Sequence, residues 1–212
     1  MINHQHKFIF IHIPKTGGTS VEMLFDRHNN ELFGFEDING NHIENKKGIQ
    51  MMLQDKSLHL KCLQHLTAVE IRDKYGEEIW NTYYKFTIVR NPWDLEVSKF
   101  TYFKTYRPDI CERLGITSQP SFHKYVLNQN GPIQLNFITD ELNNIMVNNI
   151  IRFENIQHGF DNVCKEIGIK PTQLPHELKS VRTHYRDYYN ERTRRHVETI
   201  YSEDINNFEY TY

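Results

Sequence analysis

The sequence contains little cysteine, and its cysteines are not paired. The 212 residues include only Cys62, Cys111 and Cys164, which lie far apart. A disulfide framework or a cysteine-based zinc site needs closely spaced pairs, so neither is expected. Reduced thiols in a cytoplasmic protein are expected instead.

Long apolar runs and an excess of one charge are also lacking. No stretch of about 18 apolar residues occurs, so no membrane span is expected, and residues 1–7 lack the pattern of a signal peptide. The 25 Lys and Arg residues nearly balance the 27 Asp and Glu residues. This balance disfavours nucleic acid as a partner but permits a local anion pocket. The 12 histidines form no HExxH-like pair, and no metal is expected.

Short apolar segments alternate along the chain with helical patterns. Segments rich in β-branched and aromatic residues predict strands, and segments with apolar stripes predict helices. Such alternation forms βαβ units, so we expect an α/β fold in three layers with a mostly parallel central sheet, as one domain over residues 1–212. The predicted strands are 7–13, 58–63, 84–89 and 148–153, and the predicted helices are 19–28, 67–75, 92–106, 122–127, 155–167 and 191–201.

Three of the helix starts carry capping residues. Thr19 with Glu22, and Thr67 with Glu70, have the three-residue spacing of a capping box. Asn91 followed by proline is typical of an N-cap and a first helical residue. These signals predict where the helices begin.

A glycine-containing turn follows the first predicted strand. Glycines let the backbone bend and approach an anion closely, and the free amide hydrogens of a first helical turn, with the helix dipole, bind that anion. The lysine adds a charge and the hydroxyls add donors. The segment predicts a P-loop-like phosphate-binding loop made of Pro14, Lys15, Thr16, Gly17, Gly18, Thr19 and Ser20.

The order of residues in this loop differs from that of ATPases and kinases. Their loop reads GxxxxGK[ST], with the lysine after the glycines, whereas Lys15 precedes Gly17 and Gly18. The order disfavours a nucleotide-dependent kinase without excluding it. An ordinary strand–turn–helix connection with an exposed lysine is the alternative interpretation.

A second anion site is predicted after the strand at 84–89. Arg90 directly follows this strand, at the edge where open parallel sheets bind ligands. Ser98 shares a helix face with Asp94, and helical side chains lean toward the amino terminus, so the guanidinium and the hydroxyl could hold one phosphate. Alternatively, Arg90 pairs with Asp94 or Glu96 and the serine faces solvent.

Two anion sites at one sheet edge suit a nucleotide with two anionic ends. 3′-Phosphoadenosine 5′-phosphosulfate (PAPS) carries a 5′-phosphosulfate and a 3′-phosphate, and ATP lacks the second group. The two motifs resemble those of the PAPS-dependent sulfotransferases, particularly the carbohydrate branch that includes the heparan-sulfate 2-O-sulfotransferases. Leu95 stands where this family usually has an arginine. The resembling segments are 12–20, 89–98, 151–156 and, weakly, 200–208.

The resemblance implies a reaction and its participants. A sulfuryl group would pass from PAPS to an acceptor hydroxyl by in-line displacement, leaving PAP as the product. A glycan acceptor is implied by the branch alone. Lys15 is predicted to stabilise the bridging oxygen of the donor as its bond to sulfur breaks. A late loop containing Ser180 and Arg182 is expected to close over the 3′-phosphate, as in relatives, or else to be a solvated basic turn.

His65 is the predicted general base. It follows the strand predicted at 58–63 and precedes Thr67 by two residues, which places it at the same sheet edge as both motifs. Imidazole titrates near neutral pH, which suits proton abstraction. Segment 64–68 also resembles the region of the catalytic histidine in that branch. His59 and Glu22 are the reserve candidates, and a surface or capping role is the alternative for His65.

Two other functions stay open at the level of sequence. A nucleotide-dependent kinase would need ATP and an acidic metal ligand near the loop. A non-catalytic module would bind PAP without any need for His65. The sequence predicts no oligomeric state.

Overall fold

The computed structural model describes residues 1–55, 58–107, 121–175 and 182–212. The chain divides into two compact units, residues 1–88 with 137–175 and residues 89–136 with 176–212. The single domain expected over residues 1–212 stays a prediction. Cys111 and the predicted site residue Ser180 lie outside the described residues.

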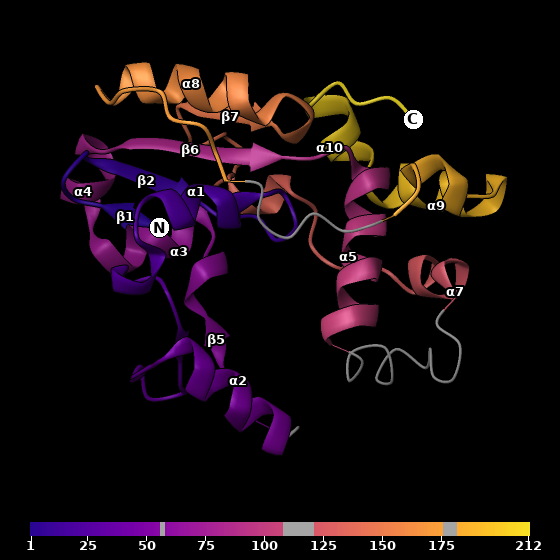
Figure 1. Ribbon diagram of the computed structural model, residues 1–212, viewed down its shortest axis with the longest axis horizontal. Helices are drawn as coiled ribbons and strands as arrows, with labels where there is room; N and C mark the ends of the chain where they lie inside the picture. Colours follow the sequence, from indigo (N-terminus) through magenta and orange to yellow (C-terminus); the bar gives the residue numbers. More distant parts are fainter. Residues whose placement is uncertain (56–57, 108–120, 176–181) are drawn as a thin grey trace. The chain divides into compact units, whose positions relative to one another are not determined.

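The first unit is built on a four-stranded sheet in the order β1-β2-β6-β7 (Figure 1). The fully buried β2 (Phe8–Ile11) pairs in parallel with β6 (Tyr84–Val89), so that Ile11 lies opposite Thr87. β1 (Ile2–Asn3) forms an antiparallel edge, and β7 (Asn149–Arg152) adjoins β6. The sheet is therefore mostly parallel, as the sequence predicts.

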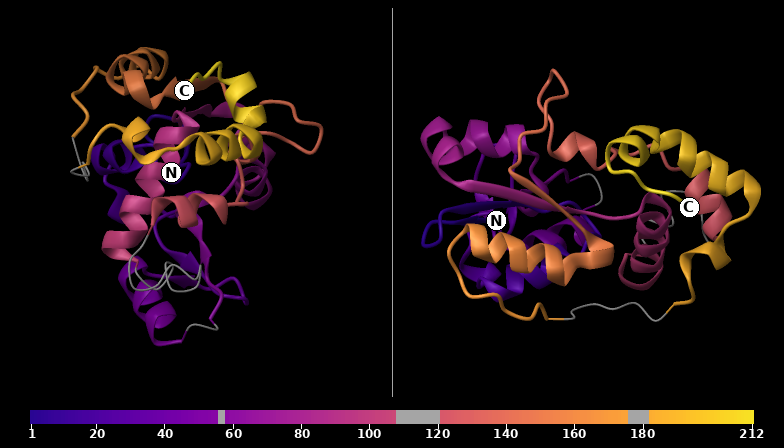
Figure 2. Two further views of the ribbon diagram at one scale, coloured as in Figure 1. Left: turned by 90° about the vertical axis from the view of Figure 1, so that its right-hand side faces the viewer. Right: turned by 90° about the horizontal axis from the view of Figure 1, so that it is seen from above.

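Helices cover both faces of this sheet. Phe10 and Phe86 pack in one core with Val21 of α1 (Gly18–Leu24) and Phe160 of α8 (Ile156–Glu166). In the right-hand view of Figure 2, α8 (orange) lies on one side of the strands and α4 (Glu77–Thr82, purple) lies on the other. The predicted three-layer α/β fold is confirmed.

The strand predicted at 58–63 does not belong to the central parallel sheet, where the sequence analysis placed it. Only Lys61–Cys62 (β5) is extended, and it pairs with β3 (Phe35–Glu36) in a separate antiparallel sheet that also contains β4 (His42–Ile43). A short helix, η2 (Leu63–His65), follows β5 at once. The alternation at 58–63 indicated extended chain but could not tell which strand it pairs with, because strand pairing depends on residues distant in the sequence.

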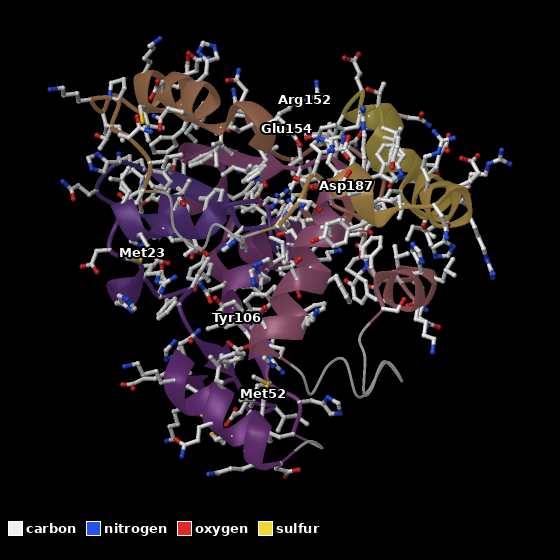
Figure 3. All side chains as sticks on the ribbon, turned by 45° about the vertical axis from the view of Figure 1, so that its right-hand side comes forward. Met23, Met52, Tyr106, Arg152, Glu154 and Asp187 are labelled. Atoms are coloured by element: carbon white, nitrogen blue, oxygen red, sulfur yellow. The ribbon has the colours of Figure 1, made fainter. Side chains whose placement is uncertain are left out.

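Helix α1 begins differently from its prediction. It starts at Gly18 with Gly17 as N-cap, and no side chain caps it. Its first turn does not use the predicted Thr19–Glu22 capping box, because the Glu22 carboxylate bonds to His12 instead. The helix also ends at Leu24 and leaves Met23 exposed (Figure 3). By contrast, α3 (Ala68–Tyr75) has the predicted Thr67–Glu70 capping box.

The second unit consists of helices around an aromatic core. Its helix α5 (Pro92–Tyr106) begins as predicted, with Asn91 as N-cap and proline at the first position. Trp93, Phe100 and Tyr125 are buried in the core of this unit. Its other helices are α7 (Phe122–Leu127), η5 (Tyr185–Tyr188), α9 (Glu191–Ile200) and α10 (Ser202–Asn207).

The remaining elements are short helices, apart from the ten-residue α2. They are η1 (Arg27–Asn29), α2 (Asn45–Gln54), η3 (Leu135–Phe137) and η4 (Phe153–Asn155). No helix within the described ranges has both the length and the apolar composition needed to cross a membrane.

Candidate active site

The predicted phosphate loop connects β2 to α1 in the first unit. Lys15 and Gly17 have positive φ values of 66° and 88°, whereas Thr16 between them does not. Residues of alternating hand turn successive amide hydrogens toward one side of a loop, which creates a concave site for an anion. The Thr16 hydroxyl is not available to that site, because it is buried and donates to the Ile13 carbonyl at 2.8 Å. Thr16 is therefore not among the hydroxyl donors to the anion, contrary to the prediction from the sequence.

The imidazole of His12 fills the space beside the start of α1. His12 is buried, and its Nδ1 lies 2.8 Å from Oε1 of the buried Glu22. A Cβ atom at Gly18 would lie 2.3 Å from Cδ2 of this ring, which is closer than any real contact. Position 18 therefore requires glycine because His12 occupies the space of a side chain.

Gly18→Ala is expected to destabilise the protein by about 1–3 kcal/mol, as overpacking does. The His12 ring cannot move aside without losing its bond to Glu22. Thermal unfolding of the variant would show this as a lowered midpoint. Gly131→Ala is the matched control, because a Cβ there meets nothing within 4 Å. Equal midpoints for the two variants would contradict the crowding at position 18.

His65 lies next to His12 in the same unit. Its Nδ1 is 2.9 Å from the main-chain carbonyl oxygen of His12, and the two imidazole rings are 4.7 Å apart at 74°. A carbonyl only accepts hydrogen bonds, so Nδ1 of His65 carries the proton and Nε2 keeps its lone pair. That tautomer is the one a general base needs, with Nε2 as the accepting atom.

The surroundings of His65 keep it neutral. Burial, followed by the charge interaction with His12, lowers the pKa of His65 to about 4. The opposing effects, the bond to the His12 carbonyl and the carboxylate of Glu22, are smaller. His65 is therefore unprotonated at neutral pH and able to accept a proton.

The two reserve candidates for the base differ in their surroundings. Glu22 is buried, and its two carboxylate oxygens bond to His12 Nδ1 and to Gln64 Nε2, the latter at 3.0 Å. Burial raises the pKa of Glu22, but the charge and hydrogen bond of His12 leave that pKa lowered overall. His59 is exposed. His65 differs from both reserve candidates, because a main-chain carbonyl fixes its neutral tautomer with Nε2 as the basic atom.

The second predicted motif forms a cluster of charges in the second unit. The Arg90 guanidinium donates to Asp94 Oδ2 from Nε at 2.8 Å and lies 2.7 Å from it through Nη2. Nη1 donates to the Ser98 hydroxyl at 3.2 Å. The structure thus contains both the predicted Arg90–Ser98 contact and the alternative pairing with Asp94. All three residues lie on or just before α5, as the helical spacing indicates.

Arg182 joins the same cluster from the late loop. Its Nη2 donates to Asp94 Oδ1, so that one carboxylate connects Arg90 and Arg182. All three side chains are largely buried. Guanidinium groups bind phosphate through charge-assisted, often bidentate hydrogen bonds, so two of them in one cluster suit a phosphate. The remaining residue predicted in this loop, Ser180, lies outside the described residues.

Sequence reasoning missed the residues that fix the Arg90 backbone. The buried Gln134 side chain accepts from the Arg90 amide at 2.7 Å and donates to the Arg90 carbonyl at 2.9 Å. Asp204, also buried, accepts from the Gln134 amide and from its side chain. Burial raises the pKa of Asp204. No local pattern predicts these contacts, although Asp204 lies in the weakly resembling segment 200–208.

Both clusters contain cationic side chains and hydrogen-bond donors. In the described part of the chain, no group of three or more His, Cys, Asp or Glu side chains is arranged to hold a metal ion. The first unit contains a lysine-containing loop and a neutral histidine. The second unit contains a separate cluster of two arginines and a serine hydroxyl.

Comparison with known proteins identifies the family. The sequence model of the sulfotransferase family matches residues 1–211, so the chain belongs to the sulfotransferase family. An uncharacterized protein of Archaeoglobus fulgidus is 31% identical over 117 residues, which cover 53% of this chain and 87% of that protein.

A solved structure supports the same fold. The chain resembles the crystal structure of mouse sulfotransferase SULT7A1 complexed with PAP, with a TM-score of 0.50 and 13% identity. The match covers 97% of this chain and 86% of the mouse chain. At this identity, the likeness establishes the sulfotransferase fold.

Proposed function

We propose that this protein is a PAPS-dependent sulfotransferase that transfers a sulfuryl group to an acceptor hydroxyl. The observation that carries the proposal is the family match over residues 1–211, which includes both anion motifs. The PAP bound in the mouse structure supports PAPS as donor and PAP as product. The loop at 14–20 would take the 5′-phosphosulfate, and the cluster of Arg90, Ser98 and Arg182 would take the 3′-phosphate.

The reaction assigns a role to each group of the loop. The acceptor oxygen attacks sulfur in line, and the bond between sulfur and the bridging oxygen breaks as PAP leaves. Lys15 and the loop amides, held by the left-handed residues 15 and 17, would stabilise the charge that develops on the leaving phosphate. Thr19 and the largely buried Ser20 are the hydroxyls of the motif that lie at the start of α1.

His65 would take the proton of the acceptor hydroxyl. The proposal is supported by its neutral state and by the bond from Nδ1 to the His12 carbonyl, which leaves Nε2 as the basic atom. The resulting imidazolium would lie beside the buried carboxylate of Glu22, whose charge raises the pKa of His65. This arrangement favours proton transfer once the reaction begins.

The proposed acceptor is a carbohydrate hydroxyl, on the basis of the resemblance to the heparan-sulfate 2-O-sulfotransferase branch. The cytoplasmic location also stays a prediction from the sequence. Labelled PAPS with a panel of glycans, phenols and tyrosine peptides would test the acceptor class. Transfer to phenols or peptides but not to glycans would contradict the carbohydrate assignment.

PAP is expected to raise the thermal midpoint more than ATP or AMP does. Ligands that bind only the folded protein stabilise it by mass action, and PAP alone among the three carries both a 5′- and a 3′-phosphate. The measurement is thermal unfolding at equal nucleotide concentrations. Stronger stabilisation by ATP would favour the kinase alternative. Binding of PAP without transfer from PAPS to any acceptor would favour the non-catalytic module.

A further inference from the structure

His12 has no role in the reaction as proposed, yet in the first unit it contacts both Gly18 of the phosphate loop and His65. It lies one residue beyond β2, between the Gly18 end of α1 and the His65 ring. Among the described residues it is the only buried histidine, at 5% exposure. A buried imidazole in this place needs a physical reason, because an apolar ring would fill the same space.

The hydrogen bonds of His12 form a continuous chain. Gln64 Nε2 donates to Glu22 Oε2, and His12 Nδ1 donates to Glu22 Oε1 at 2.8 Å. The His12 carbonyl then accepts from His65 Nδ1 at 2.9 Å. Gln64 and His65 are sequence neighbours, so the chain closes on itself through η2. Each member therefore restrains the next.

Contacts of the His12 ring restrain two further groups. The His12 ring packs against the His65 ring in a T-shaped arrangement, with ring centroids 4.7 Å apart. Its Cδ2 and Nε2 atoms occupy the space beside Gly18, where α1 begins. Glu22 holds the ring in this orientation, since a carboxylate bonded to Nδ1 leaves the imidazole little rotational freedom.

We propose that His12 is a positioning residue of the active site, whose carbonyl fixes the tautomer of His65 and whose ring, held by Glu22, fixes the place of His65 against the phosphate loop. The inference rests on the proposed function, because it assigns His65 as the base. His12 touches neither the donor nor the acceptor in this assignment. Its effect reaches the reaction through His65 and Gly18.

Electrostatics give this arrangement a measurable signature. The titratable groups that face His65 are His12 from the end of β2, Glu22 from α1 and the amino group of Met1, with Cys62 three residues before it. Of these, His12 has the largest influence, and it lowers the pKa of His65. Replacing His12 is therefore expected to raise that pKa, so the ionisation of His65 reports on its contact with the His12 ring.

Two substitutions separate the donor of His12 from its ring. His12→Phe keeps a ring beside Gly18 but loses the hydrogen bond to Glu22, and His12→Asn keeps a donor near the Nδ1 position but loses the ring. His12→Phe is expected to lower kcat about 100-fold, as misplacement of a catalytic group by about 1 Å does, with PAP affinity within a few-fold of the parent. His12→Asn is expected to lower kcat as well, because it removes the ring that packs against His65. His158→Asn, at an exposed position on α8, is the matched control.

Imidazole NMR titration of His65 provides a readout independent of turnover. Both His12 variants are expected to titrate His65 at higher pH than the parent, with Nδ1 still protonated in its neutral form. An unchanged pKa of His65 in both variants, or a kcat of His12→Phe within threefold of the parent, would overturn the proposal. Equal losses of kcat and PAP affinity together with lower thermal midpoints in both variants would also overturn it, since they indicate a structural role only.

The same design separates this inference from the proposed function. If the parent transfers no sulfate from PAPS, the proposed function fails, and the His65 titration still decides whether His12 controls that ring. If His12→Phe does not fold, the kcat, PAP affinity and titration of His12→Asn decide the outcome alone. A shifted titration with unchanged kcat in that variant would count against positioning.

Discussion

His65→Ala is expected to lower kcat by about 10²–10⁴-fold, the range typical of general acid–base groups. The affinity for PAP is expected to stay within about twofold, because neither predicted phosphate motif contains His65. Single-turnover assays with PAPS and equilibrium binding of PAP would separate the two effects. The structural basis is the bond from His65 Nδ1 to the His12 carbonyl, which leaves Nε2 as the only basic atom of the ring.

Two control variants make this result specific. His158→Ala changes an exposed histidine of the same unit and is expected to leave kcat unchanged. His59→Ala tests the reserve candidate. Turnover of His65→Ala within a few-fold of the parent, together with a large loss in His59→Ala, would move the base to His59.

The pH profile is a further property of the same assignment. A general base works only when unprotonated, so activity falls as the pH drops below its pKa. With the pKa of His65 at about 4, kcat/KM for PAPS is expected to stay level from neutral pH down to about 5 and to fall below that. In kcat the fall is expected at higher pH, because the bound anionic donor stabilises the imidazolium. A kcat/KM profile that already falls near pH 6.5, the value for ordinary histidine, would contradict the lowered pKa of His65.

Arg90→Lys is expected to weaken PAP binding by roughly 10–100-fold while changing AMP binding little. Hydrogen bonds to charged groups contribute about 1.5–3 kcal/mol each, and lysine cannot reproduce the forked geometry of a guanidinium. AMP lacks the 3′-phosphate, so it reports on the rest of the nucleotide site. Calorimetric titration of both nucleotides would measure the ratio of the two affinities.

Arg90 also pairs with the largely buried Asp94, so its removal affects stability as well as binding. Breaking a buried pair costs about 3–5 kcal/mol, and for this reason lysine is preferred to alanine at position 90. Ser98→Ala is the second variant, since it removes only the hydroxyl that accepts from Arg90 Nη1. An unchanged ratio of PAP to AMP affinity in both variants would remove this cluster from the nucleotide site.

Much of the fold could be predicted because its signals are local. The strand–loop–helix at 8–24, the strand at 84–89 and the helix from Pro92 each carry their signals within a few residues. The two-residue strands β3 and β4 carry no such periodicity and were missed. The extended segment before His65 was predicted in the wrong sheet, because its pairing partner lies far back in the chain.

The candidate site shows the same division. Helical spacing predicted the contact between Arg90 and Ser98, since both lie on one face of α5. The role of Glu22 was predicted wrongly, because its three-residue distance from Thr19 fits a capping box whereas its actual partner is His12. A histidine directly after β2, with a glutamate ten residues later, was the available signal for that pair. This spacing of histidine and glutamate matches no known sequence motif, so it could not be told apart from a chance occurrence.

The side chain of Gln134 has a consequence for how this chain can change. A carboxamide offers an acceptor oxygen and two N–H donors, and Gln134 uses the oxygen and one N–H on the main chain of Arg90, 44 positions earlier. Asp204, a further 70 positions along, holds Gln134 in turn. The main-chain conformation of Arg90, directly after β6, thus depends on Asp204 near the carboxyl end of the chain. A substitution at position 134 is expected to preserve these hydrogen bonds only when position 204 changes as well. The two positions are therefore expected to covary across the family.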